Sequence, residues 1–250
     1  MIRKIALILA ALLTLGAPTA VVASTANAVT TTETVSAGLP PGVDRPTFLL
    51  SPHQDDELIR LGGYMTRVTD RGDEMHLVQV TDGAATQVKN TLGISAATTE
   101  RWRNIEQRNA WQWTTDGRGQ ITYLREPDGA ANADRIYTQV KAMMDAAGPY
   151  SELYVATWHY DRPESVREDQ HVDHIASVDA ARRIAADGYV VRYAVHPRVG
   201  DIAGSSIKYQ ASGEQLYRIE GAVKSYGVIG YRSTPANLDR ARDGLTRVTS

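Results

Sequence analysis

The chain has 250 residues, of which 27 are basic and 29 acidic, so its formal net charge is −2 with neutral histidines. Basic runs with interleaved aromatic residues are missing, so we expect no nucleic-acid partner and no attraction to an anionic membrane. Cysteine is absent as well, which excludes disulfides, thiol catalysis and a cysteine-bound metal.

Residues 1–28 have the pattern of a cleavable export signal. Basic residues come first, an apolar run spans Ile5 to Leu15, and small residues lead to Ala26-Asn-Ala28, a typical cleavage site. The apolar run is too short and too interrupted for a membrane span. We therefore expect a secreted protein without a stable membrane anchor; an uncleaved anchor is the alternative. The Thr-rich residues 29–43 predict a flexible linker, and residues 44–250 predict one folded domain.

Along that domain, short apolar runs alternate with amphipathic stretches. The sequence predicts strands at Thr47–Leu50, Met75–Thr81, Gln120–Leu124, Leu153–Thr157 and Tyr189–Val195. Helices are predicted from Leu58 until a stop at Gly72, from about Thr98 to Trp113, and over Ala133–Ala147, Ile175–Ala186 and Ser212–Tyr226. This alternation predicts a Rossmann-like three-layer α/β sandwich with a mostly parallel sheet in a single domain. Residues 82–99 are expected to form a long loop, and the residues beyond Thr234 a terminal helix or a frayed tail.

Two fingerprints common in α/β enzymes are absent. No G-x-G-x-x-G follows the first predicted strand, because Gly62 and Gly63 fall inside the predicted helix. An enzyme that uses a nicotinamide or a methyl donor on this fold is therefore not expected. The sequence also contains no G-x-S-x-G elbow, which argues against a serine hydrolase.

A polar cluster follows the first strand directly. Pro52 ends the strand because it has no N–H to donate, and His53, Asp55, Asp56 and Glu57 come within the next five positions. Ligands bind at the carboxyl ends of strands in open α/β sheets. One carboxylate could therefore bind a metal beside His53 while its neighbour holds a water as general base. An acidic helix N-cap with a chance histidine explains the same residues.

A second polar cluster, His171-Val-Asp-His174, lies far downstream. Together with Pro52-His-Gln-Asp-Asp-Glu57 it resembles the signature of the LmbE-like, or PIG-L, deacetylases. These are zinc-dependent enzymes that remove acyl groups from N-acetylglucosamine-type sugars. The family usually has His-Pro-Asp-Asp-Glu, and Gln54 stands here in place of the proline, a position that supports the loop and does not bind the metal. The likeness runs from about Phe48 to Arg232.

The resemblance implies one zinc ion per chain and assigns roles to the clustered residues. The implied metal ligands are His53, Asp56 and His174, the implied base is Asp55, and the implied acid is His171, oriented by Asp173. A ligand set of nitrogen and oxygen also accepts other first-row divalent ions. Some family members have a tyrosine as an extra oxyanion donor where this chain has Asp169, and Tyr160 is a candidate substitute. His159 and His196 are expected to be structural.

Two substrate-binding residues follow from the resemblance, each with an alternative. Arg103-Asn-Ile-Glu106 resembles the family's Arg-x-x-Glu, whose arginine tends to face the sugar, but a solvated i,i+3 pair explains it equally. Pro127-Asp-Gly129 resembles a family turn whose aspartate often contacts substrate hydroxyls, and this assigns Asp128 to the substrate. Asp-Gly is also simply favourable turn chemistry.

These motifs encode the reaction and not the substrate, so three interpretations stay open. The first is a secreted deacetylase acting on a small-molecule or oligosaccharide amino sugar. The second is a zinc amidase acting on a non-sugar amide, and the third is a zinc-loaded carbohydrate-binding protein without catalysis. Asp55 and His171 speak against the third, because a binding module needs neither base nor acid. Export favours cell-wall, antibiotic or environmental amino sugars over cytoplasmic precursors.

Overall fold

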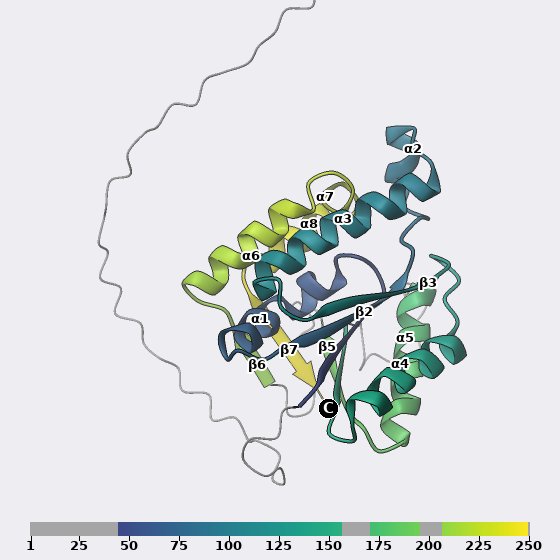
Figure 1. The fold of residues 1–250 in the computed structure, drawn as a ribbon. Helices are drawn as coiled ribbons and strands as arrows, with labels where there is room; N and C mark the ends of the chain where they lie inside the picture. Colours follow the sequence, from purple (N-terminus) through teal and green to yellow (C-terminus); the bar gives the residue numbers. More distant parts are fainter. Residues whose placement is uncertain (1–44, 157–170, 196–206, 250) are drawn as a thin grey trace, which may run out of the picture. The chain divides into compact units, whose positions relative to one another are not determined.

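The computed structural model describes residues 45–156, 171–195 and 207–249 (Figure 1). Contacts divide the chain into two units, Met1–Pro41 and Gly42–Ser250, and the described residues belong to the second. Several sequence predictions lie outside them: the signal and the linker, and the positions of His159, Tyr160, Asp169 and His196. Within the described ranges, no helix combines the length and apolarity needed to cross a membrane.

Seven strands form one sheet in the order β3-β2-β1-β4-β5-β7-β6. They are β1 (Thr47–Ser51), β2 (Met75–Thr81), β3 (Gln120–Glu126), β4 (Glu152–Ala156), β5 (Val190–Val195), β6 (Ile207–Gln210) and β7 (Leu245–Thr249). The first five are parallel, whereas β7 runs antiparallel to both β5 and β6. The predicted α/β fold with a mostly parallel sheet is thereby confirmed.

Helices cover both faces of the sheet (Figure 1). They are α1 (Asp56–Asp70), α2 (Val88–Leu92), α3 (Ala96–Thr115), α4 (Ala133–Ala147), α5 (Val172–Ala186), α6 (Glu214–Ser225), α7 (Gly230–Ser233) and α8 (Pro235–Ala241). The apolar residues of α4 and α5 join one core cluster with the sheet, and those of α1 and α3 join another. Helices α6 and α8 pack outside α1 and α3 in a third cluster. The predicted three layers are therefore present.

Strand β1 is buried on both sides, which explains its continuous apolar sequence. Phe48 and Leu50 face the α4–α5 layer, and Leu49 faces the α1 layer. Helix α1 can lie close to the loop before β7 because residue 63 is glycine. A Cβ added at Gly63 would lie 2.3 Å from the Gly244 carbonyl oxygen.

The expected frayed tail beyond Thr234 is wrong. Residues Pro235–Ala241 form helix α8, as the alternative had it, but Leu245–Thr249 form strand β7, which pairs on both sides. Val248, buried in the core, lies opposite Ala194 and Ile207. Such a short strand, with three polar residues among its five, carries little signal of its own, and its neighbouring strands supply the burial that stabilises it.

The expected loop over residues 82–99 is also only partly a loop. It contains the one-turn helix α2 and the first residues of α3, which begins at Ala96 rather than near Thr98. Ser95 caps α3, because its side-chain oxygen accepts the Thr98 N–H at 3.1 Å. The segment is therefore anchored to α3 at its end.

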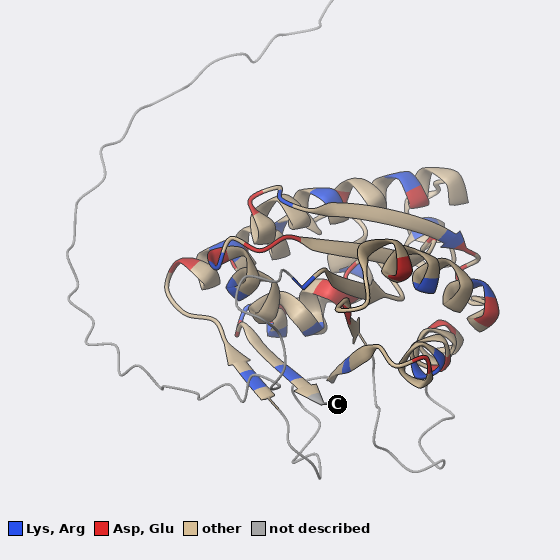
Figure 2. Ribbon diagram, turned by 60° about the horizontal axis from the view of Figure 1, so that its bottom comes forward, with Lys and Arg blue, Asp and Glu red and all other residues tan. Residues whose placement is uncertain are grey.

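The order of the strands creates the place for a site. From β1 the chain proceeds to β2 and β3, then returns to β4 on the other side of β1, so the carboxyl ends of β1 and β4 form a topological switch point. The turn after β1 and the first turn of α5, the helix after β4, carry the two polar clusters. Basic and acidic residues are interspersed over the described helices (Figure 2).

Candidate active site

The turn after β1 is held in place by hydrogen bonds of its backbone. The Asp55 and Asp56 N–H groups donate to the His53 carbonyl at 3.0 and 3.3 Å, and Asp56 opens α1. The Pro52 carbonyl accepts the Thr81 N–H at 3.1 Å and the Thr81 hydroxyl at 2.8 Å. The turn is therefore fixed to the end of β2.

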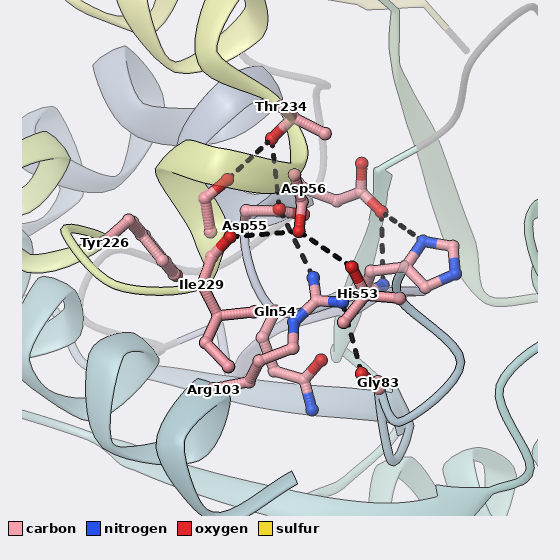
Figure 3. A network of polar contacts seen from close by, with 12 residues as sticks. His53, Gln54, Asp55, Asp56, Gly83, Arg103, Tyr226, Ile229 and Thr234 are labelled. Atoms are coloured by element: carbon pink, nitrogen blue, oxygen red, sulfur yellow. Dashed lines mark hydrogen bonds and ion pairs between the residues drawn. The ribbon is translucent and has the colours of Figure 1, made fainter. Parts of the chain in front are cut away.

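Gln54, which stands where the family has proline, is fully buried, and its side chain points away from the ring of His53 (Figure 3). Its amide nitrogen donates to the Thr81 carbonyl at 3.2 Å and to Asn104 Oδ1 at 3.0 Å. Gly83 leaves room for it, since an added Cβ there would lie 2.1 Å from Gln54 Oε1. Gln54 thus ties the turn to α3.

Three predicted metal ligands converge on one point. His53 Nδ1 and His174 Nε2 each lie 3.2 Å from Asp56 Oδ2, and all three groups are placed to hold a metal ion. A tetrahedral zinc ion keeps its ligand atoms about 3.3 Å apart, because its bonds to nitrogen and oxygen are about 2.0–2.1 Å long. Two imidazoles and one carboxylate therefore fit a hydrolytic zinc ion, in both chemistry and spacing.

The pKa values of His174 and Asp56 favour metal binding, whereas that of His53 opposes it in the absence of an ion. Burial lowers the pKa of His174 to about 4, so its ring is neutral and can donate a lone pair at neutral pH. Burial alone would raise the pKa of Asp56, but His174 and His53 hold it well below its usual value. Burial alone would lower the pKa of His53, and contacts with carboxylates, first that of Asp128, raise it well above its usual value. An ion on Nδ1 would take the place of that positive charge.

Asp55 is buried beside this group but has other partners (Figure 3). Its Oδ2 accepts hydrogen bonds from Arg103 Nη2 and from the Thr234 hydroxyl, both at 3.3 Å. Burial raises the pKa of Asp55, and the Arg103 charge opposes that rise. The two adjacent carboxylates are therefore separated, one toward the histidines and one toward α3 and Thr234.

Asp173 connects His53 with His171. Its Oδ2 lies 3.1 Å from His53 Nε2 and 3.2 Å from His171 Nδ1. The backbone N–H groups of Gly129 and Ala131 donate to its two oxygens at 2.8 and 3.0 Å. The contact between Asp173 and His171 is the one that the predicted orienting role requires. The contact between Asp173 and His53 was not predicted.

Asp128 lies at the same junction. Its Oδ1 is 3.5 Å from His53 Nε2, and its Oδ2 accepts the Ala85 N–H at 2.8 Å. The contact with His53 holds the pKa of Asp128 well below its usual value, against the effect of burial. Favourable turn chemistry alone therefore does not account for Asp128, because its carboxylate faces His53.

The solvated Arg103–Glu106 pair weighed from sequence is wrong. Both side chains are buried and have separate partners. Arg103 contacts Asp55, and Glu106 accepts the backbone N–H groups of Val228, Ile229 and Gly230 at 2.6, 2.8 and 3.0 Å. The i,i+3 spacing showed that the two residues share a helix face. It did not show that this face is buried, because the segment that covers Glu106 follows more than a hundred residues later. Arg103 still borders the cavity, and its contact with the sugar stays a prediction.

Three further residues at the site were not found from the sequence. Arg60 is fully buried with its Nε 3.5 Å from Asp56 Oδ1. Thr234 contacts Asp55 from the loop before α8, and Tyr226 donates from the end of α6 to buried Glu57. Glu57 also accepts from Ser51 and Gln107. The i,i+4 spacing of Asp56 and Arg60 could have indicated that Arg60 lies on the same helix face as the ligand. No local sequence pattern indicates that Thr234 or Tyr226 belongs to the site.

A cavity of about 500 Å³ opens onto these groups. Besides the polar residues above, it is lined by Ile59, Ala85, Thr86, Gln87, Ser233 and Asn237. A larger cavity of about 990 Å³ lies at the opposite, amino ends of β1 and β2. None of the three potential metal ligands, His53, Asp56 and His174, borders the larger cavity, so the smaller cavity is the candidate active site.

Sequence comparison agrees with this geometry. The family model described as PIG-L: GlcNAc-PI de-N-acetylase matches residues 48–185, a stretch that covers more than half of the chain and both polar clusters. The chain belongs to the PIG-L family. A search of curated proteins gave no match.

Solved structures share the fold of this PIG-L chain at low identity. A zinc-inhibited form of a teicoplanin deacetylase aligns with TM-score 0.61 and 16% identity over 82% of this chain and 98% of its own. An N,N′-diacetylchitobiose deacetylase from Pyrococcus horikoshii aligns with TM-score 0.56 and 16% identity over 78% and 75%. A 4-carboxy-2-hydroxymuconate hydratase from Pseudomonas putida aligns with TM-score 0.54 and 12% identity over 79% and 82%. At such identities the likeness establishes the fold, and the site must carry the function.

Proposed function

We propose that the chain is a secreted, zinc-dependent hydrolase that removes the N-acetyl group from an amino sugar of the N-acetylglucosamine type. One observation carries the proposal. His53, Asp56 and His174 meet at one point, while Asp55 lies beside them with separate partners. A hydrolytic metal site needs this combination of three ligands and an independent base. The family description, a de-N-acetylase of a GlcNAc lipid, supports the same reaction class.

The chain supplies the proton transfers. A zinc ion held by His53, Asp56 and His174 would act as the Lewis acid for the water and the amide carbonyl. Asp55 borders the cavity and takes the proton of the attacking water. His171, half-exposed at the cavity and in contact with Asp173 through Nδ1, gives a proton to the departing amine. Asp173 orients the ring of His171 through this contact.

The cavity supports an amino-sugar substrate. Thr86, Gln87, Ser233 and Asn237 add hydroxyl and amide groups to its wall, and such groups suit the hydroxyls of a neutral sugar. Two of the similar structures are deacetylases named for teicoplanin and for diacetylchitobiose. Arg103 and Asp128 are the proposed sugar contacts, and both border the cavity.

The alternatives make different demands on the same pocket. A non-sugar amidase would keep every catalytic residue, and a zinc-loaded sugar-binding protein would need only the ligands. A hydratase has the same fold, so the fold alone does not determine the reaction. The presence of Asp55 and His171 beside the ligand group favours hydrolysis.

The deciding experiment measures released acetate. The purified chain, depleted of metal with a chelator and then reloaded with zinc, is given N-acetylglucosamine, diacetylchitobiose and N-acetylated non-sugar amides. We expect zinc-dependent hydrolysis of the sugars and little hydrolysis of the other amides. Hydrolysis of only the non-sugar amides would favour the amidase, and sugar binding without hydrolysis would favour the binding protein.

Export is proposed on the pattern of residues 1–28. The mature chain should begin near Val29 and accumulate outside the cytoplasm. N-terminal sequencing of protein from the culture medium tests this, and an intact Met1 there would contradict it.

A further inference from the structure

Asp55, the proposed base, is held through one of its two oxygens. Its Oδ2 accepts hydrogen bonds from Arg103 Nη2 and from the Thr234 hydroxyl, both at 3.3 Å. Within the part of the chain that the structure describes, both hydrogen bonds to this carboxylate end on Oδ2 and none on Oδ1. Asp55 borders the cavity. Two donors on one oxygen therefore leave the lone pairs of the other for a water molecule.

Thr234 comes from a short segment whose position needs other support. Helix α7 has only four residues and is too short to be stable by itself. The carbonyl of Gly230, its first residue, accepts the Thr234 N–H at 3.0 Å and lies 3.4 Å from the Thr234 hydroxyl. That hydroxyl has a single proton, which an ionised carboxylate attracts more strongly than a carbonyl does. The position of Gly230 therefore places the hydroxyl that Asp55 accepts.

Glu106 holds the start of this segment. Its Oε1 accepts the N–H groups of Val228 and Ile229 at 2.6 and 2.8 Å, and its Oε2 accepts that of Gly230 at 3.0 Å. These donors lie at the amino end of α7, where a helix leaves N–H groups without internal partners and where negative charge is favourable. Glu106 is buried, so the three bonds are shielded from water. One carboxylate thus fixes three consecutive residues.

Arg103 and Glu106 lie one turn apart on α3, so one helix face reaches Asp55 by two routes. Arg103 contacts Asp55 directly, and Glu106 acts through residues 228–234. We propose that Glu106 and Thr234 are positioning residues, which turn the Asp55 carboxylate so that Oδ1 receives the proton of the attacking water. The use of that proton rests on the proposed function, whereas the orientation of the carboxylate does not.

Loss of either positioning residue should slow turnover and leave the bound zinc. Thr234→Val removes one of the two donors to Oδ2, and Glu106→Gln replaces an acceptor oxygen by an NH2 group that faces a backbone N–H. Each zinc-loaded variant should lose about tenfold to a hundredfold in kcat at nearly constant KM, since a displacement of about 1 Å can cost about a hundredfold. Thr234→Ser keeps the hydroxyl and should restore most of the rate. The double variant should be no slower than the slower single variant, because both changes act on one contact.

Two matched controls should keep the unmodified kcat. Thr115→Val removes a buried hydroxyl of α3 that donates to the Trp111 carbonyl at 2.8 Å. Glu100→Gln removes a carboxylate of α3 that pairs with Arg125 at 2.9 Å. Neither Thr115 nor Glu100 borders the cavity.

Three kinetic results would contradict the proposal. An unchanged kcat for zinc-loaded Thr234→Val would overturn it, and so would a Thr234→Ser variant as slow as Thr234→Val. Losses that multiply in the double variant would overturn the shared route from Glu106 to Asp55.

Crystal structures of the unmodified protein and of Glu106→Gln give a readout that needs no substrate. In the variant we expect residues 228–234 to shift and the separation of Thr234 Oγ1 from Asp55 Oδ2 to exceed hydrogen-bonding distance. An unmoved Thr234 would overturn the role of Glu106. If Glu106→Gln folds poorly, Thr234→Val is crystallised instead; it should show a rotated Asp55 carboxylate, and an unrotated one would overturn the proposal. If the protein deacetylates nothing, the proposed function fails, and these structures alone decide on the positioning.

Discussion

Asp55 and Asp56 are adjacent in sequence, yet one contacts Arg103 and Thr234 and the other contacts two histidines. Asp55→Asn should therefore keep the bound zinc and lower the deacetylation rate by about a hundredfold to ten-thousandfold, the usual size of a general acid–base contribution. Asp56→Asn should release the metal first and lose activity as a consequence. Metal content and rate are measured on the same preparations. Near-normal hydrolysis by metal-loaded Asp55→Asn would contradict this division of roles.

Glu57, the third acidic residue of the motif, has a pKa raised to about 7 by burial. Its unfolded pKa is about 4.3, so the folded state favours the protonated form. The associated stability is complete below about pH 4.3 and is lost as the pH rises through about 7. Relative to Glu57→Gln, which cannot ionise, the metal-free protein should lose about 2–3 kcal/mol of unfolding free energy between pH 5 and pH 8. Urea unfolding of both proteins at the two pH values measures the difference, and parallel pH dependence would refute it.

The helices of this fold approach their neighbours at particular glycines, and α1 offers a matched pair. A Cβ at Gly63 would meet the Gly244 carbonyl at 2.3 Å, whereas at Gly62 its closest neighbour would be the flexible end of Leu58 at 3.3 Å, with Ile219 at 3.8 Å. Gly63→Ala should cost about 1–3 kcal/mol through overpacking. Gly62→Ala should be near neutral or stabilising by up to about 1 kcal/mol, because alanine favours helices. Denaturant unfolding compares the two, and equal stabilities would show that the loop before β7 moves freely.

The helices and strands that the sequence predicted are those of the central parallel sheet and of the layers that cover it. Strand β2 and helix α4 match the predicted bounds Met75–Thr81 and Ala133–Ala147, because their apolar periods extend over the whole element. Strands β6 and β7 were missed because four or five residues at the antiparallel edge contain too few apolar positions. The ligand set was predicted from the family resemblance of two short motifs, each of which is local although they lie far apart in the chain. The roles of Thr234, Tyr226 and Glu106 depend on contacts across the fold, which no local pattern reveals.

For the molecule as a whole, the ligand group connects the start of α1 with the start of α5. An unfolded chain has no such group, so zinc should bind the folded state and stabilise it by about 4 kcal/mol at a thousandfold excess over Kd. For a domain of this size, that corresponds to a rise of Tm on the order of 10 °C. Thermal unfolding with zinc and with a chelator measures it. His174→Ala, which removes one ligand, should abolish most of the shift; an unchanged shift would contradict the ligand assignment.

Strands β1 and β4 are neighbours in the sheet, with Thr47 opposite Glu152, although about a hundred residues separate them in the sequence. This sequence separation has a consequence for how the protein is made. A ribosome delivers His53 and Asp56 before β4 and His174, so the growing chain carries only two of the three proposed ligands for nearly half of its synthesis. The proposed ion should bind firmly only after the chain has been made through α5 and β1 has paired with β4. With the proposed export of an unfolded chain, that ion would come from the compartment in which the chain folds.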